Sequence, residues 1–230
     1  MTGGTASNKR EFIQFMVRCG VLTFGDFVTK SGRRTPFFVN TGRYRTGDQL
    51  RQLAGFYART ITEQFGDGFD VLFGPAYKGI PLAVAIAMEL ARTSGRDVPF
   101  CFDRKEAKDH GEGGSLVGHP LAAGDRVLIV EDVTTAGTSI GETVPKLRAA
   151  ADIRLAGLVV SVDRMERGSG DLAALAEIAH TWEMPTRAIV TIDEIMNDLR
   201  GREVDGRVVL DDETFERMVA YRREWGPRLG

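Results

Sequence analysis

The middle of the chain alternates short apolar segments with helix-like segments, and this rhythm constrains the fold more than any other feature. The pattern predicts strands at 70–74, 98–102, 127–131, 154–162 and 187–191, and helices at 79–92, 138–149 and 171–182. Strands that alternate with helices form βαβ units, so we expect an α/β fold with a mostly parallel sheet flanked by helices. Ligands of such sheets bind at the carboxyl ends of the strands. The loops that begin at Gly74, Phe102, Glu131 and Val162 should therefore lie along one edge and form the functional site.

The ends of the chain follow other patterns. Asn8 to Glu11 resembles a capping box that starts a helix, and Gly20 stands where that helix would stop. Two strands are predicted at 22–29 and 35–40, and a last helix, at about 213–225, is expected to pack as an addition to the core. We expect a small N-terminal subdomain (1–45, the hood), a core (46–200) and a C-terminal helical extension (201–230).

Composition indicates a single soluble domain and excludes several classes of protein. The 230 residues suit one domain, and 30 basic residues nearly balance 32 acidic ones, which gives no support for nucleic-acid or membrane-surface binding. Cys19 and Cys101 are far apart and form no metal-binding motif, so a reducing cytoplasm is the expected setting. The longest apolar stretch, around Ile80 to Met88, is well short of the roughly 20 residues that span a bilayer.

The segment from Val127 to Ser139 joins a strand to a helix through two acids and a loop of small residues. Glu131 and Asp132 end the predicted strand, and the backbone N–H groups that open the next helix are unpaired and suited to bind an anion. One turn thus offers a phosphate cradle beside two acids that can hold hydroxyls or a metal. The alternative is an ordinary turn whose acids are solvated and whose Thr and Ser only cap the helix. No Walker motif occurs.

Two further loops on the predicted edge carry charged side chains. In 74–81, Gly74 and Gly79 allow the backbone to approach a ligand and Lys78 lies between them, although a tight turn with a solvated lysine explains the same pattern. The segment 102–118 is a long polar insertion with three glycines near its middle. A loop of this length is either a functional lid or a solvated, mobile hairpin.

These segments together resemble a known family. Residues 127–139 resemble the 5-phosphoribosyl 1-diphosphate (PRPP) signature of the type I phosphoribosyltransferases, and Arg104 to Gly114 is similar to the catalytic loop of the orotate phosphoribosyltransferases. The resemblance implies the type I fold with its N-terminal hood. It also implies catalytic roles for Lys105, Lys108, His110 and Asp132. The implied PRPP-binding residues are Lys30, Tyr77, Lys78, Arg104, Lys105, Lys108, His110, Glu131, Asp132, Val133, Thr134, Thr135, Ala136, Gly137, Thr138 and Ser139.

The implied orotate-binding residues are Phe37, Phe38, Thr135 and Arg164. From the sequence pattern alone, Phe37 and Phe38 are equally core residues of a strand, and an arginine placed as Arg164 is most often solvated or salt-bridged. In the family the Phe-Phe step holds the orotate ring largely through backbone groups. An arginine in the pattern Asp-Arg-x-Glu-Arg-Gly offers a planar fork that suits an oxygen-rich ring.

The resemblance implies an activity, a cofactor and partners. The activity is transfer of a phosphoribosyl group from PRPP to orotate, which gives orotidine 5′-monophosphate and diphosphate in the biosynthesis of the pyrimidine nucleotide UMP. Mg²⁺ would be held mainly by substrate oxygens with no direct protein ligand, which fits its preference for few protein ligands. A homodimer is implied, in which the lid of one subunit closes over the active site of the other.

The sequence leaves two alternative functions open. A purine or uracil phosphoribosyltransferase would share residues 127–139 but would not need Phe37, Phe38 or the 103–118 loop as written. A PRPP-sensing regulator that binds nucleic acid would call for a helix-turn-helix module or a basic face, and neither is apparent in the sequence.

Overall fold

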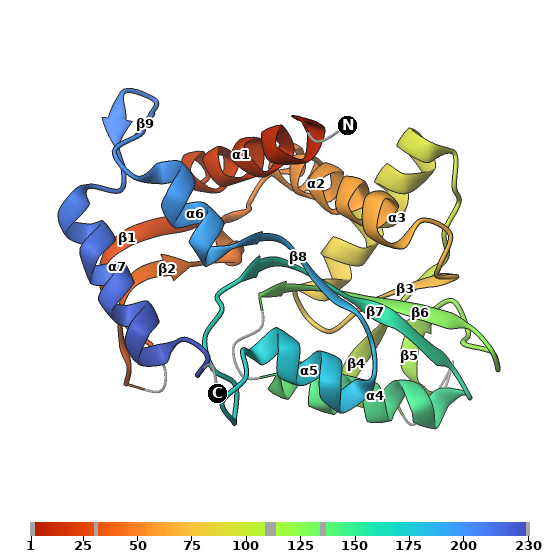
Figure 1. Cartoon of the computed structure of the whole chain (residues 1–230). Coiled ribbons are helices and arrows are strands. Elements are labelled where there is room, and N and C mark those ends of the chain that lie inside the picture. The colour runs from red at the N-terminus through yellow and green to blue at the C-terminus, as the bar shows by residue number, and fades with distance from the viewer. Residues whose placement is uncertain (1–2, 30–31, 109–113, 134–136, 229–230) are drawn as a thin grey trace.

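The core is a six-stranded sheet in the order β5-β4-β3-β6-β7-β8 (Figure 1). The computed structural model describes residues 3–29, 32–108, 114–133 and 137–228. The strands are β3 (Val71–Gly74), β4 (Phe100–Lys108), β5 (Gly114–Gly118), β6 (Arg126–Val133), β7 (Arg154–Asp163) and β8 (Thr186–Thr191). All neighbouring pairs are parallel except β4 with β5. The predicted α/β fold with a mostly parallel sheet is therefore confirmed.

Helices cover both faces of the sheet, as Figure 1 shows with α1 to α3 on one side and α4 and α5 on the other. These helices are α1 (Gly3–Arg18), α2 (Gly47–Phe65), α3 (Gly79–Ser94), α4 (Thr138–Ala150) and α5 (Ala174–Trp182). The strands are apolar without alternation because both faces are buried. In β6, for example, Leu128 and Val130 pack with α1 to α3, whereas Val127 and Ile129 pack with α4 and α5.

The segment predicted as a long polar insertion is a hairpin at the edge of the sheet. Antiparallel pairing joins β4 to β5 from Cys101 opposite Gly118 to Lys108 opposite Gly114. The apolar and polar residues of 98–102 predicted only the start of β4, because the charged residues that continue the strand have no strand pattern of their own. The hairpin therefore lengthens β4 beyond the predicted end.

The hood contains the antiparallel strands β1 (Leu22–Val28) and β2 (Arg34–Val39), and a short 3₁₀ turn (Thr41–Arg43) follows. The predicted capping box at Asn8 is wrong, because α1 already begins at Gly3. The side chain of Asn8 is buried instead, and its Oδ1 accepts a hydrogen bond from Nη1 of Arg59 at 2.5 Å. The predicted stop at Gly20 is confirmed by its φ of 65°.

The C-terminal part folds back over the hood. It consists of α6 (Ile192–Leu199), a hairpin of β9 (Glu203–Val204) and β10 (Arg207–Val208), and α7 (Asp212–Trp225). Helix α6 was not predicted, although Thr191 and Glu194 form a capping box at its start. In Figure 1, α7 lies along β1 and β2 of the hood. Helix α7 packs on the hood, and α1 packs on the core. The domain boundaries at 45 and 200 stay predictions.

Within the described ranges, no helix combines the length and apolar character needed to cross a membrane.

Candidate functional site

The carboxyl ends of four parallel strands meet at one edge of the sheet, as predicted. Gly74 at the end of β3 pairs with Phe102 in β4, and Val133 at the end of β6 pairs with Val162 in β7. The loops after β3, β6 and β7 therefore begin side by side, and β4 continues from the same edge into its hairpin with β5. These loops bring the acids of β6 close to Lys78, to the start of α4 and to the loop after β7.

The two acids at the end of β6 lie in different surroundings. Glu131 is largely buried, and burial raises the pKa of its carboxyl from 4.5 to about 7, although a hydrogen bond from Ser139 acts in the opposite direction. Its Oε1 accepts that bond from the Ser139 hydroxyl at 2.7 Å. Its Oε2 is buried and has no hydrogen-bond partner among the described residues. A buried carboxylate oxygen without a partner is costly, so it marks a place where a donor from a ligand would fit.

Asp132 is held by two side chains, one from the turn after β2 and one from the loop after β3. Lys78 donates from Nζ to Oδ2 of Asp132 at 2.8 Å and to Oγ1 of Thr41 at 3.1 Å. Thr41, at the start of the turn after β2, also donates its hydroxyl to Oδ2 of Asp132. These contacts place a cation directly beside the acid pair, although the Lys78 side chain itself is 61% exposed.

Two side chains that the sequence did not identify fix the backbone of the acid pair. Tyr57 of α2 donates its hydroxyl to the carbonyl oxygen of Glu131 at 2.7 Å, and Ser161 of β7 donates to the carbonyl oxygen of Asp132 at 2.5 Å. Tyr57 is completely buried, and burial raises the pKa of its phenol well above the ordinary value, so it remains a donor. One residue of the sheet and one residue of a helix that covers the sheet thus hold the backbone of the two acids.

Helix α4 begins at Thr138, shortly after the acids along the chain. Gly137 caps it with a φ of 71°, a conformation that glycine adopts without strain. A Cβ at this position would also lie 3.1 Å from Cγ1 of Ile178 in α5. The first N–H groups of α4, including those of Thr138 and Ser139, have no partner within the helix and can bind an anion. The predicted site residues Thr134, Thr135 and Ala136 lie outside the described residues.

The loop after β3 approaches the backbone of α3 closely. A Cβ on Gly74 would lie 2.0 Å from the carbonyl oxygen of Gly79, and a Cβ on Gly79 would lie 2.6 Å from the carbonyl carbon of Gly74. Only glycine fits at either position. Between them, the peptide bond from Ala76 to Tyr77 is cis, and Tyr77 is 67% exposed.

An ion pair with a buried aspartate supports this loop. Asp103 of β4 is 5% exposed and accepts a hydrogen bond from the backbone N–H of Ala76 at 2.7 Å. Lys146 of α4 donates to the other oxygen of Asp103, also at 2.7 Å. The pair belongs to a polar cleft of about 470 Å³ whose lining includes Pro75, Ala76, Asp103, Ser139, Glu142, Thr143 and Lys146. The cleft connects the β3 loop to the start of α4.

The predicted lid residues are only partly within the described part of the chain. The backbones of Arg104, Lys105 and Lys108 belong to β4, which rises from the same edge of the sheet. His110 and Lys30 lie outside the described residues. The roles of all five in catalysis or PRPP binding stay predictions.

Three of the predicted acceptor residues, Phe37, Phe38 and Arg164, lie where β2 of the hood meets the loop after β7. Phe37 is fully buried in the core, whereas Phe38 is 38% exposed and stacks on Phe27 with ring centroids 5.5 Å apart. The guanidinium carbon of Arg164 lies 4.4 Å above the ring centre of Phe37. The structure therefore brings Phe37 and Arg164 together, and Phe37 is also a core residue, as its strand pattern allowed.

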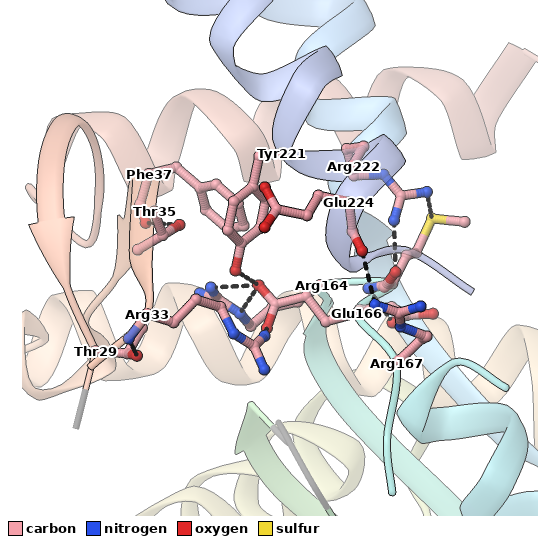
Figure 2. A network of polar contacts seen from close by, with 12 residues as sticks. Thr29, Arg33, Thr35, Phe37, Arg164, Glu166, Arg167, Tyr221, Arg222 and Glu224 are labelled. Atoms are coloured by element: carbon pink, nitrogen blue, oxygen red, sulfur yellow. Dashed lines mark hydrogen bonds and ion pairs between the residues drawn. The ribbon is translucent and has the colours of Figure 1, made fainter. Parts of the chain in front are cut away.

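Arg164 is also salt-bridged, as expected of many arginines after strands. Its Nε and Nη2 both donate to Oε1 of Glu166, at 3.0 and 2.6 Å (Figure 2). Figure 2 shows Arg33 from the hood and Tyr221 from α7 directed at the same carboxylate. Glu166 is part of the Asp-Arg-x-Glu-Arg-Gly pattern, but no role was predicted for it.

No group of three or more His, Cys, Asp or Glu side chains that could hold a metal ion is present among the residues with described positions. Carboxylate oxygens of Glu131 and Asp132 lie at the site. Two carboxylates can contribute to a site for a hard cation that keeps most of its ligands from substrate or water.

Comparison with known proteins gives consistent results at the level of sequence and structure. A family model described as a phosphoribosyl transferase domain matches residues 41–196. An orotate phosphoribosyltransferase from Lachnoclostridium phytofermentans is 57% identical over 218 residues, which cover 95% of this chain and 97% of that protein. One from Clostridium acetobutylicum is 55% identical with the same coverage. The solved orotate phosphoribosyltransferase of Francisella tularensis superposes with a TM-score of 0.81 at 37% identity, and the match covers 94% of this chain and 99% of that chain.

Proposed function

This chain belongs to the orotate phosphoribosyltransferases of the phosphoribosyl transferase family, and we propose that it transfers the phosphoribosyl group of PRPP to orotate. The products are orotidine 5′-monophosphate and diphosphate, as in pyrimidine nucleotide biosynthesis. One observation carries the proposal. The edge of the sheet joins an acid pair, a cation and a helix N-terminus on one side to a buried arginine over an aromatic ring on the other.

The acid pair and α4 form the sugar-phosphate half of the site. Glu131 and Asp132 would accept hydrogen bonds from the ribose hydroxyls, and the N–H groups at the start of α4 would bind the 5′-phosphate. The bond from C1′ to the diphosphate oxygen breaks with positive charge building on the sugar. A negative field from two carboxylates held in place by Tyr57 and Ser161 stabilises that charge.

The leaving-group half consists of cations. Lys78 lies beside Asp132, and Arg104, Lys105, Lys108 and His110 of the lid would neutralise the diphosphate as its charge develops. Lys30, Tyr77, Val133 and residues 134–139 complete the proposed PRPP contacts. Mg²⁺, held mainly by substrate oxygens, would supply further positive charge at the diphosphate.

The acceptor half consists of Arg164, Phe37, Phe38 and Thr135. Arg164 would bind the carboxylate and ring oxygens of orotate, which already carries a negative charge. A ring nitrogen of orotate then forms the new bond to C1′ as the bond from C1′ to the diphosphate oxygen breaks, and the proton of that nitrogen is lost to the diphosphate or to solvent. No nucleophilic side chain is needed, so catalysis rests on positioning, charge neutralisation and exclusion of water by the lid.

The assembly and location are part of the proposal. We infer a homodimer in which the β4–β5 lid of one subunit covers the site of the other. Two unpaired cysteines, Cys19 and the buried Cys101, favour a reducing cytoplasm.

The acceptor specificity is tested by offering orotate, uracil, adenine and guanine in turn, each with PRPP and Mg²⁺, and measuring diphosphate release. Orotate alone should support release. Turnover of a purine or of uracil in its place would overturn the acceptor assignment. Binding of PRPP without turnover of any base, together with tight binding of a DNA fragment, would favour a regulator instead.

A further inference from the structure

Glu166 is the junction of three segments that are distant in sequence. Its side chain is 7% exposed, and both oxygens are engaged. Oε1 accepts from Nε and Nη2 of Arg164 and from the Tyr221 hydroxyl at 2.8 Å, and Oε2 accepts from Nη1 of Arg33 at 3.0 Å. Figure 2 shows these groups converging from the loop after β7, the hood and α7.

The junction determines how Arg164 is oriented. Because Nε and Nη2 both donate to Glu166, the remaining nitrogen, Nη1, lies on the side of the guanidinium that faces away from Glu166. The ring centre of Phe37 lies 4.4 Å from the central carbon of the Arg164 guanidinium, so the ring limits how far the guanidinium can tilt. Arginine loses considerable rotamer freedom when it is held in this way, so the cost of ordering it is met before a ligand arrives.

Helix α7 supplies the second support. Tyr221 meets Phe37 edge-on, with ring centroids 5.9 Å apart and planes at 88°, and it donates to Glu166. Trp225, one turn later, lies under Arg33, whose guanidinium carbon is 4.2 Å from its ring centre. Burial raises the pKa of the Tyr221 phenol, so the hydroxyl keeps the proton that it donates.

We propose that Glu166 and Tyr221 are positioning residues that hold Arg164 ready for the acceptor, so that the C-terminal helix sets the affinity for orotate. The inference rests on the proposed function, because it takes Arg164 as the acceptor-binding group. It assigns a role to a helix in which the sequence shows no functional motif. The acceptor half of the site is then held by residues other than those of the PRPP half, in which Tyr57 and Ser161 hold the backbone of the acid pair.

Tyr221→Phe tests the inference with little change in shape. It removes one hydrogen bond to a charged group, which is expected to raise KM for orotate about three- to tenfold. KM for PRPP and the turnover number at saturating substrates should stay within about twofold of the parent. An unchanged KM for orotate would overturn the inference.

Asp193→Asn is the matched control. Asp193 of α6 pairs with Arg222 of α7 at 2.8 Å and anchors the same helix without touching Glu166. If Tyr221 only holds α7 in place, the two variants will raise KM for orotate to the same degree, and this result would contradict a positioning role. We expect Asp193→Asn to leave KM for orotate at the parent value.

A double-mutant cycle with Arg164→Gln tests whether Tyr221 acts through Arg164. In the Arg164→Gln background, Tyr221→Phe should have no further effect on kcat/KM for orotate, because residues that act through one group are not additive. Full additivity would contradict the inference. The parent protein decides the proposed function separately, since a parent that uses a purine rather than orotate overturns that function, whereas an orotate-dependent parent with additive variants overturns only the positioning role.

Discussion

Ser139 donates its hydroxyl hydrogen to Oε1 of Glu131 at 2.7 Å, which ties the first turn of α4 to the acid at the end of β6. This bond links the two ends of the segment that we propose binds the sugar phosphate. It also leaves Oε2 of Glu131 as the oxygen without a partner among the described residues. The acid is therefore placed for a hydroxyl donor, and its protonation should control how well PRPP binds.

PRPP binding should strengthen as the pH rises through the range of the Glu131 pKa. Burial raises that pKa to about 7, so at pH 6 most of the carboxyls carry a proton and at pH 8 most are ionised. Calorimetric titration with Mg²⁺ and PRPP should show the affinity rising several-fold between these values. Glu131→Gln should keep only the part of the slope that comes from the phosphates of PRPP, and an equal slope in both proteins would contradict this role.

Protein stability should change in the opposite direction. The folded pKa of Glu131 lies above the unfolded value near 4.5, so the folded state binds the proton more tightly. Its contribution is complete below pH 4.5 and is lost as the pH rises through about 7. Denaturant titrations at pH 5 and pH 8 should show a loss on the order of 1–3 kcal/mol from this group. Glu131→Gln should reduce the difference between the two pH values, and an undiminished difference would show that other groups cause it.

Lys78→Met should impair activity without affecting stability. The ion pair of Lys78 with Asp132 is largely exposed on the lysine side, and such pairs contribute about 0–1 kcal/mol to folding. Loss of a cation beside the leaving group should nevertheless lower kcat/KM for PRPP by about tenfold to a hundredfold. Arg51→Met is the control, because it breaks an exposed pair with Asp48 in α2, neither residue of which belongs to the proposed site, and it should leave both quantities unchanged. Parent-level kcat/KM in Lys78→Met would remove Lys78 from the site.

The lid is tested by Lys105→Ala and Lys108→Ala. If both lysines stabilise the developing diphosphate, each variant should lower turnover by about 10²- to 10³-fold. Orotate affinity, measured by calorimetry, should change much less, because the acceptor half of the site is separate. Turnover at the parent level in both variants would show that the β4–β5 hairpin is not a catalytic lid.

Gly74→Ala should unfold or strongly destabilise the protein. The new methyl group would lie 2.0 Å from the carbonyl oxygen and 2.5 Å from the carbonyl carbon of Gly79. Both of these atoms belong to the backbone, so we expect a loss of about 3 kcal/mol or more. Gly141→Ala in α4 is the control. Its Cβ would meet nothing within 4 Å, so it should gain roughly 0.5–1 kcal/mol from helix propensity. Thermal unfolding of both variants checks the difference, and equal melting temperatures would contradict it.

The alternation of strands and helices was sufficient to predict the sheet edge where the site lies. Glu131, Asp132 and Lys78 were found for the same reason, because each follows a strand with a strong apolar pattern. Residues 104–108 were expected in a polar insertion, whereas their backbone extends β4. Strand pairing at a sheet edge decides that conformation, and the charged residues give no local sign of it.

Supports that act over long sequence separations could not be predicted. Tyr57 reaches the carbonyl of Glu131 from a helix 74 positions away, and Tyr221 reaches Glu166 across 55 positions. A tyrosine on the buried face of a helix has the pattern of a core residue in either case. Asn8 was predicted to cap a helix for a related reason. An asparagine ahead of a glutamate has the pattern of a helix cap, whereas Asn8 accepts a hydrogen bond from Arg59 and links α1 to α2.

The most direct test of the central claim is to identify the product. PRPP labelled with ¹³C in the ribose, Mg²⁺ and orotate are incubated with the protein, and the mixture is analysed by mass spectrometry. We predict labelled orotidine 5′-monophosphate and diphosphate in equal amounts, with neither formed when orotate is omitted. Diphosphate release without a labelled nucleotide, or a labelled purine nucleotide formed from a mixture of bases, would contradict the assignment.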